Sequence, residues 1–367
     1  MVTYTDAVLE ALDRLDGLGP EMGEAGFVNH GPMAAEALAA LGHGDQVGAW
    51  VQTWRAARGF HEAPPPAFDL DSTDQRSWQA ALGDHHQLGQ WEGLFRRELA
   101  GQPWQDVLAR WWPRLIPGLF TRVTHGLIRT AHAVRGLAST TTTTGDAQLI
   151  ELARALAMWA SRYTALPGSA TLTGRSDVTS AVASLPRTWL DPTDQLPWTE
   201  ATRDRLQRPD QLPGYLPALA ALNSGDPHRL ITELTTEFAG IYQAHSEAVP
   251  VPLVHTVTAP AAVRLVLPYL PADVHEATVA ALWQANVAML LAFTVDRRGE
   301  DTALSTATES DPPPFDELIA RAVEHGDDHV IKFTEACARE HALRPDPRFP
   351  AAVHAAHQRI PHLNPHS

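Results

Sequence analysis

The sequence predicts an all-α protein, and three observations carry this prediction. Apolar residues recur at helical spacing along most of the 367 residues. Period-two runs rich in Val, Ile and Thr are scarce, and the nearest is PVPLVHTVTAP at 250–260. The apolar fraction of 44% and the charged fraction of 19% are those of a globular chain that can bury a sizeable core.

Helices are expected where the apolar periodicity is strongest. In chain order these segments are 5–17, 31–42, 45–57, 75–99, 104–116, 119–138, 147–164, 228–245, 259–267, 272–294, 315–324, 328–342 and 350–357. Turn residues cluster between them at 61–68, 139–145, 166–177, 186–215 and 309–316. The pattern predicts a single helical domain over residues 1–367, with an irregular excursion at about 165–215.

Composition excludes several classes of function. A formal net charge of -15 argues against binding to nucleic acids and to anionic membrane surfaces. The amino terminus carries acids where a signal peptide needs a basic start, and no segment reaches the ~20 apolar residues of a membrane span. We therefore expect a soluble, cytoplasmic protein. A single cysteine, Cys337, leaves histidine and carboxylate as the candidate metal ligands.

Eighteen histidines are many for this length, and several lie on predicted helices. His125, Arg129 and His132 share one helical face, which would be polar within an otherwise apolar helix. His30 precedes a helix start at Gly31-Pro32, and His255 lies in an apolar segment. Each could line a site for metal or proton transfer, or could be a capping or buried histidine bonded to the backbone.

Lys332 is the only lysine in a chain with 27 arginines. Gly326 ends one predicted helix, Asp327 or Asp328 can cap the next, and His329 and Lys332 then share one face. A cation near a helix N-terminus is electrostatically misplaced. Unlike arginine, a buried lysine can lose its proton, and a neutral amine can form a Schiff base or add carbon dioxide to give a carbamate. A retained surface lysine is the plainer alternative.

Three tryptophans, Trp50, Trp54 and Trp283, are candidates for a flat aromatic pocket, although tryptophan on a helical face is more often part of the core. No strand followed by GxGxxG occurs, so the sequence carries no dinucleotide-binding fingerprint of the kind that a flavin or NADPH enzyme ordinarily shows.

Four sequence blocks together resemble the questin oxidase-like family. They are GFVNHGPMAAEALAALG, PRLIPGLFTRVTHGLIRTAHAVRGL, PLVHTVTAPAAVR and DDHVIKFTEACAREH, spread from about residue 26 to 342. The resemblance implies a non-heme iron oxygenase that opens a ring of an aromatic polyketide such as an anthraquinone. It implies four imidazole ligands and a carboxylated lysine, namely His30, His125, His255, His329 and Lys332, with Fe(II) and carbon dioxide as cofactors.

Fungal relatives tend to have histidines where this chain has Met33 and Arg129, and here His132 stands one turn further on. His132 is then either a replacement ligand or a proton donor, and His132 and Arg129 are the candidate catalytic residues. Dioxygen and an aromatic substrate are the expected partners, and an external reductant is compatible with this chemistry. Three rival functions stay open: a zinc hydrolase with the same cluster, a Schiff-base lyase using Lys332, and a helical binding protein of a biosynthetic pathway.

Overall fold

A computed structural model describes residues 2–23, 26–139, 145–187, 205–246, 248–294 and 296–363. The first half of the chain forms α1 (Tyr4–Arg14), α2 (Gly31–Ala40), α3 (Val47–Ala56), α4 (Gln75–Ala81), α5 (Leu88–Gly101), α6 (Trp104–Leu115), α7 (His125–Ala138) and α8 (Asp146–Ser161). The second half forms α9 (Val178–Ser184), α11 (Tyr215–Ala218), α12 (Pro227–Ala244), α13 (Pro250–Val266), α14 (His275–Phe293), α15 (Ala303–Glu309), α16 (Phe315–His325), α17 (Asp328–Leu343) and α18 (Arg348–Arg359).

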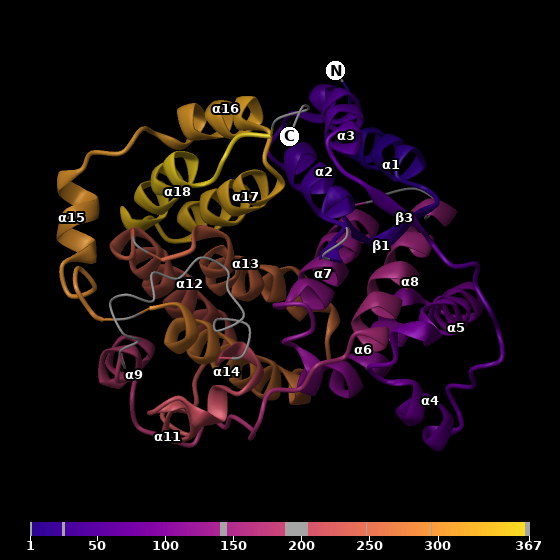
Figure 1. Cartoon of the computed structure of the whole chain (residues 1–367), viewed down its shortest axis with the longest axis horizontal. Coiled ribbons are helices and arrows are strands. Elements are labelled where there is room, and N and C mark those ends of the chain that lie inside the picture. Colours follow the sequence, from indigo (N-terminus) through magenta and orange to yellow (C-terminus); the bar gives the residue numbers. More distant parts are fainter. Residues whose placement is uncertain are drawn as a thin grey trace.

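The all-α prediction is confirmed, since helices make up most of the described chain (Figure 1). A small antiparallel sheet, which the sequence reading did not anticipate, has the strand order β2-β1-β3. Its strands are β1 (Leu18–Met22), β2 (Phe27–Val28) and β3 (Phe60–Glu62). Short 3-10 helices occur at Gly44–Gln46, His85–Gln87, Ile116–Gly118, Pro209–Gln211, Leu267–Tyr269 and Ala272–Val274.

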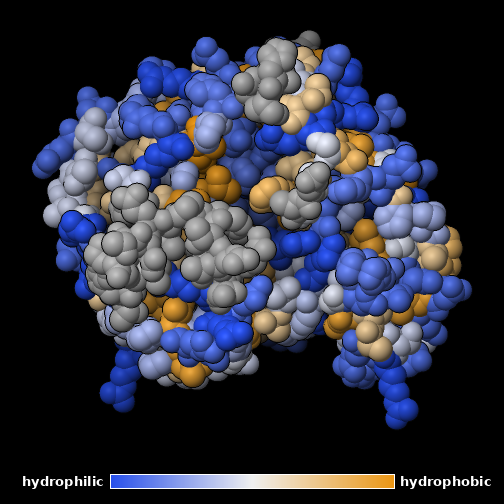
Figure 2. Space-filling model, in the orientation of Figure 1, coloured by the Kyte–Doolittle hydropathy of each residue, from blue (hydrophilic) through white to orange (hydrophobic). Residues whose placement is uncertain are grey.

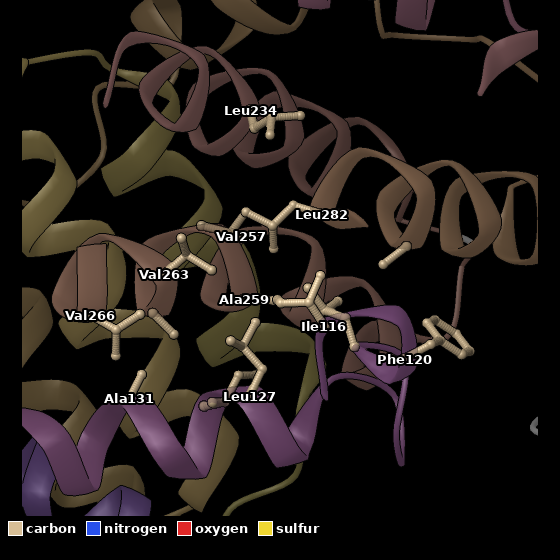
Figure 3. Close-up of a cluster of buried hydrophobic side chains, with 14 of the residues drawn as sticks. Ile116, Phe120, Leu127, Ala131, Leu234, Val257, Ala259, Val263, Val266 and Leu282 are labelled. Carbon is tan, nitrogen blue, oxygen red and sulfur yellow. The ribbon is translucent and has the colours of Figure 1, made fainter. Parts of the chain in front are cut away.

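Four helices meet where the two halves of the chain come together. α2 and α7 from the first half pack against each other, α17 packs on α2, and α13 packs on both α7 and α17 (Figure 1). The apolar contact between α7 and α13 is dense, with Leu127 and Ala131 facing Val263 and Val266 (Figure 3). One hydrophobic core accordingly includes residues from Val28 to Ile360. This junction is the scaffold for the candidate site.

Segment 250–260, the most strand-like run of the sequence, is helical and forms most of α13. Pro250 lies in the first turn, where a missing N–H costs no hydrogen bond. Pro260 lies inside the helix and cannot donate to the carbonyl of Thr256, four residues earlier. The Asn286 side chain of α14 donates to that carbonyl instead, over 2.9 Å. Burial on all sides explains why the apolar pattern lacks a helical period here.

Two predicted helices are shorter than their apolar patterns. The segment 75–99 is divided at Gly83, which has a φ of +79°, so that α4 and α5 are separate helices. The segment 119–138 becomes helical only at His125, because Arg122, Val123 and Thr124 all have positive φ angles. Of the predicted excursion, residues 188–204 lie outside the described part, as do residues 140–144 of the threonine run.

The expectation that no segment reaches the length of a membrane span is wrong by length and composition alone, since two helical segments, Pro250–Tyr269 and Ala272–Phe293, are long and apolar enough. They are 78% and 83% buried within the fold, as core helices of a soluble protein are. The face shown in Figure 2 is largely hydrophilic, with scattered apolar residues. The structure therefore supports a soluble protein, and the cytoplasmic location stays a prediction.

Candidate metal centre

The structure brings four of the predicted histidines together at the junction of α2, α7, α13 and α17. His30 precedes α2, His125 begins α7, His255 lies in α13 and His329 is the second residue of α17. The Nε2 atom of His125 lies 2.6 Å from Nε2 of His30 and 3.1 Å from Nε2 of His255. The rings of His30 and His329 meet edge to face at 4.5 Å between centroids. One small volume thus receives three imidazoles from three separate helices and a fourth from the residue that precedes α2.

Backbone carbonyls fix the tautomers of two of these imidazoles. Nδ1 of His125 donates to the carbonyl of Arg122, and Nδ1 of His255 donates to the carbonyl of Val251 over 3.0 Å. Burial lowers the pKa of both histidines well below the usual value, and the neighbouring imidazoles lower it further. With the single proton of each neutral ring on Nδ1, both Nε2 atoms keep a free lone pair that points into the cluster.

The unprotonated Nε2 atoms are better placed to bind a metal ion than to contact each other directly. Two lone pairs at 2.6 or 3.1 Å repel unless a cation or a proton lies between them. Two nitrogens that are each about 2.1 Å from one ion lie about 3.0 Å apart when they subtend a right angle. Suitable donor atoms of His30, His125 and His329 all lie within 4.8 Å of one another. The donor set, neutral imidazole, is one that zinc, iron and copper accept.

A buried carboxylate lies behind the other two imidazoles. Oδ1 of Asp328 is 3.1 Å from Nδ1 of His30 and 3.0 Å from Nδ1 of His329. Burial lowers the pKa of His30 to about 3. The pKa of His329 is raised. Burial acts to lower it, but the charge of Asp328 and the hydrogen bonds of the imidazole with Asp327 and Asp328 outweigh burial. Sequence reasoning missed Asp328 as part of this site and treated it only as a possible helix cap.

Lys332 is buried on α17, one turn after His329, and is 4% exposed. Burial lowers the pKa of its amine to about 8, although Asp328 and Asp327 oppose the shift. Its charge in turn helps to lower the pKa of His30, His125 and His255. Within the described part of the chain, no hydrogen bond or ion pair reaches the amine. The surface alternative for Lys332 is wrong.

Local backbone features hold the first two histidines in place. Asn29 caps the start of α2, accepting from the N–H of Gly31 over 3.0 Å and donating to the carbonyl of Gly19 over 2.8 Å. His30 makes no capping hydrogen bond with its side chain, so its ring is free for the cluster. Before His125, three left-handed residues turn the chain so that the Arg122 carbonyl reaches the imidazole.

Arg129 and His132 lie further along α7 in a second polar cluster. Arg129 donates to both oxygens of Glu151, over 2.7 and 2.9 Å, and Nδ1 of His132 lies 2.5 Å from Oε2 of Glu36. Arg135 also donates to Glu36, over 2.6 and 2.5 Å. Arg129 and His132 line a cavity of about 20 Å³, which has room for one water molecule. Their carboxylate partners were not anticipated from the sequence.

The three candidate tryptophans do not line one pocket, and that prediction is wrong. Trp50 and Trp54 stack on each other in the cluster around α1, α2 and α3, whereas Trp283 is buried in the main core and donates to the carbonyl of Ala218. Trp54 donates to Oδ2 of Asp328 over 2.9 Å. Its connection to the site is therefore through a carboxylate.

Fold and cluster together define a mostly helical protein with a candidate metal centre built from three buried histidines and one partly buried histidine. The family model described as Questin oxidase-like matches residues 27–337, a range that includes every proposed ligand. The chain therefore belongs to the questin oxidase-like family. The comparison with curated proteins found no match. Because the family is named for an oxidase, the class of chemistry indicated for the chain is oxidation.

Proposed function

We propose that the protein is a metal-dependent oxygenase that opens or oxygenates a ring of an aromatic polyketide such as an anthraquinone. The observation that supports this proposal best is the convergence of bare Nε2 atoms at 2.6 and 3.1 Å, in a chain whose family is named for an oxidase. Fe(II), when bound, supplies a redox-active centre for the activation of dioxygen. The proposed imidazole ligands are His30, His125, His255 and His329.

Lys332 is the proposed fifth ligand, as a carbamate. With a pKa of about 8, roughly a quarter of the amine is neutral at pH 7.5, against about 0.1% for a solvated lysine. The neutral amine attacks carbon dioxide, an N–C bond forms, and one proton leaves the nitrogen. The product carries one negative charge and an oxygen donor in place of a buried cation. It also removes the electrostatic conflict between a lysine and the start of α17.

We propose that Arg129 and His132 take part in proton transfer next to the metal centre. They line a cavity together with Pro32 and Met33, which follow His30 in α2. The imidazole of His132 can carry a proton against the Glu36 carboxylate, at 2.5 Å, and a single water in the cavity could pass it on. Arg129 and Glu151 also line this cavity, and their ion pair holds both side chains in place.

The substrate and the oxygen stoichiometry belong to the same proposal. Insertion of both atoms of dioxygen into the product needs no reductant. Insertion of one atom, with reduction of the other to water, takes two electrons from an external reductant. Product analysis after reaction under labelled dioxygen separates these two cases, and we place the reaction in the cytoplasm.

Metal analysis after anaerobic loading with Fe(II) tests the central claim. We expect about one ion per chain in the natural protein, and a large loss of bound metal in His255→Ala, because that imidazole lies in the cluster. His61→Ala, at an exposed histidine, is the matched control and should bind as the natural protein does. Absence of stoichiometric metal from the loaded natural protein would sink the proposal.

Lys332→Ala tests the carbamate separately. We expect weaker metal binding that short carboxylic acids partly restore, because they supply the missing anionic oxygen. Intact mass measured with carbon dioxide present should show a gain equal to one carbon dioxide in the natural protein and none in the variant. Unchanged metal content in Lys332→Ala would remove Lys332 from the ligand set. Trapping of Lys332 by borohydride with a carbonyl substrate would instead support a Schiff base.

A further inference from the structure

Asp328 is the first residue of α17 and is buried, with 1% of its surface exposed. Its neighbour Asp327 performs the capping of this helix, accepting from the N–H groups of His329 and Val330 over 2.9 and 3.3 Å. The Asp328 carboxylate therefore has no capping role. A buried charge persists in a fold only when specific partners compensate its lost hydration.

The partners of Asp328 are its own neighbour His329 and residues from two other parts of the chain, before α2 and at the end of α3. Oδ1 lies 3.1 Å from Nδ1 of His30 and 3.0 Å from Nδ1 of His329, whereas Oδ2 accepts from Nε1 of Trp54 over 2.9 Å. The guanidinium of Arg58 is 3.9 Å from Oδ2 and partly exposed. The indole N–H thus fixes the plane of the carboxylate, and the carboxylate presents a single oxygen to two imidazoles.

This arrangement differs from that of the other two imidazoles in the cluster. His125 and His255 are oriented by backbone carbonyls, which carry no net charge. His30 and His329 share a full negative charge at 3.1 and 3.0 Å from their Nδ1 atoms, which favours the tautomer with the proton on Nδ1 and with Nε2 bare. A carboxylate at this place also adds a negative charge next to the centre without occupying a ligand position.

We propose that Asp328 is a positioning residue for the metal centre, holding His30 and His329 in the ligating tautomer, with Trp54 as its anchor. The inference rests on the proposed function, since it assigns a role towards the same ion. It also divides the four imidazoles into a pair set by backbone carbonyls and a pair set by one carboxylate.

Asp328→Asn tests the inference with Co²⁺ as the probe. An amide at this position turns an NH₂ group towards either the indole N–H or an imidazole N–H, so one contact is lost or one imidazole moves its proton to Nε2. We expect the apparent dissociation constant for Co²⁺ to rise about 10- to 100-fold. The visible spectrum of bound Co²⁺ should change as well, because ligand geometry determines it, and a merely structural role of Asp328 would leave it unchanged.

Asp226→Asn is the matched control, because it removes the same charge from the exposed N-cap of α12, away from the site, and asparagine is an equally good cap. We expect a change in affinity of less than about threefold and an unchanged spectrum. Trp54→Phe removes only the indole N–H and should give an effect between those of the two aspartate variants. Trp54→Phe also carries the test if Asp328→Asn does not fold, as judged by circular dichroism.

The failures are distinguishable. If the natural protein binds no Co²⁺ and no Fe²⁺, the proposed function fails and the inference fails with it. If the natural protein binds the ion, but folded Asp328→Asn or Trp54→Phe keeps the same affinity and spectrum, the inference is overturned and the proposed function stands.

Discussion

At the start of α7, His125 faces two other imidazoles, whereas Arg129 and His132, one and two turns further on, face the carboxylates of Glu151 and Glu36. Every polar group of the second cluster has an oppositely charged partner, as buried charges require for stability. The first cluster violates this rule, because Nε2 of His125 meets only other Nε2 atoms. In one helix, therefore, the histidine whose Nε2 lacks a suitable partner within the protein is the one placed to bind a ligand, whereas the fully paired residues line the small cavity.

The largest effect on this comparison is expected from Glu36→Ala. Glu36 has a side chain 4% exposed and interacts with His132, Arg135 and the hydroxyl of Tyr4. Its removal leaves these groups buried without their anion, and we expect a loss of about 3–5 kcal/mol in the free energy of unfolding. Denaturant titration measures the loss.

Glu317→Ala is the control for that experiment. Glu317 forms an exposed ion pair with Arg321 one helical turn away, and such pairs contribute less than about 1 kcal/mol. Equal losses in the two variants would contradict the contrast between a buried, fully paired cluster and the surface.

Mild acid should affect the two clusters at different pH values. The pKa of His30 is lowered to about 3, and those of His125 and His255 are lowered as well, so these rings stay neutral in the fold. The unfolded chain takes up these protons below about pH 6.5, so stability falls as the pH drops from there, by about 1.4 kcal/mol per pH unit for each group. Unfolding of metal-free protein at pH 7, 6 and 5 measures this.

The carboxylate cluster responds only in stronger acid. Burial raises the pKa of Glu36, but Arg135 and His132 outweigh burial and lower it to about 2. Its contribution is present above about pH 4.5 and is lost as the pH falls towards 2. His255→Gln should make the profile between pH 6.5 and 5 less steep, whereas the same slope in that variant would show that His255 is not held neutral.

The smallest effect is expected at the turn before α7. Val123 has a φ of +56°, which costs a β-branched residue roughly 1–2 kcal/mol relative to glycine. Val123→Gly removes this strain but adds freedom to the unfolded chain, and we expect a net gain of about 0.5–1 kcal/mol in stability. Weaker Co²⁺ binding in the more stable variant would show that the strained turn serves to orient His125. A loss of stability would show that the turn is not strained.

The sequence predicted helices and candidate ligands better than it predicted their partners. Helical spacing located α2, α7 and α17, and the isolated lysine drew attention to residue 332. Glu36, Glu151 and Asp328 gave no such signal, because an acidic residue on a helix usually faces solvent. The doublet Asp327-Asp328 does carry a signal for a second role, because a helix start uses one capping side chain and the other carboxylate is then left for other partners.

Some predicted helix boundaries were wrong because an unusual backbone conformation or a distant contact determines them. Nothing in the apolar pattern of 119–138 reports three successive left-handed residues, since arginine, valine and threonine rarely adopt this conformation. The strand-like run 250–260 is helical because a tertiary contact compensates for Pro260. The compensating amide of Asn286 lies 30 residues after Thr256, whose carbonyl it satisfies. Such compensation is invisible to reasoning within a short window.

The proposed ligands run from residue 30 to residue 332 in a chain of 367 residues, and this spread has a consequence for biosynthesis. The whole segment from His30 to Lys332 must be synthesised before the last donor exists, so the nascent protein cannot assemble the full site until α17 has been made. Metal loading would then follow translation. A product that ends just before Lys332 would keep the four imidazoles and lack the proposed anionic ligand.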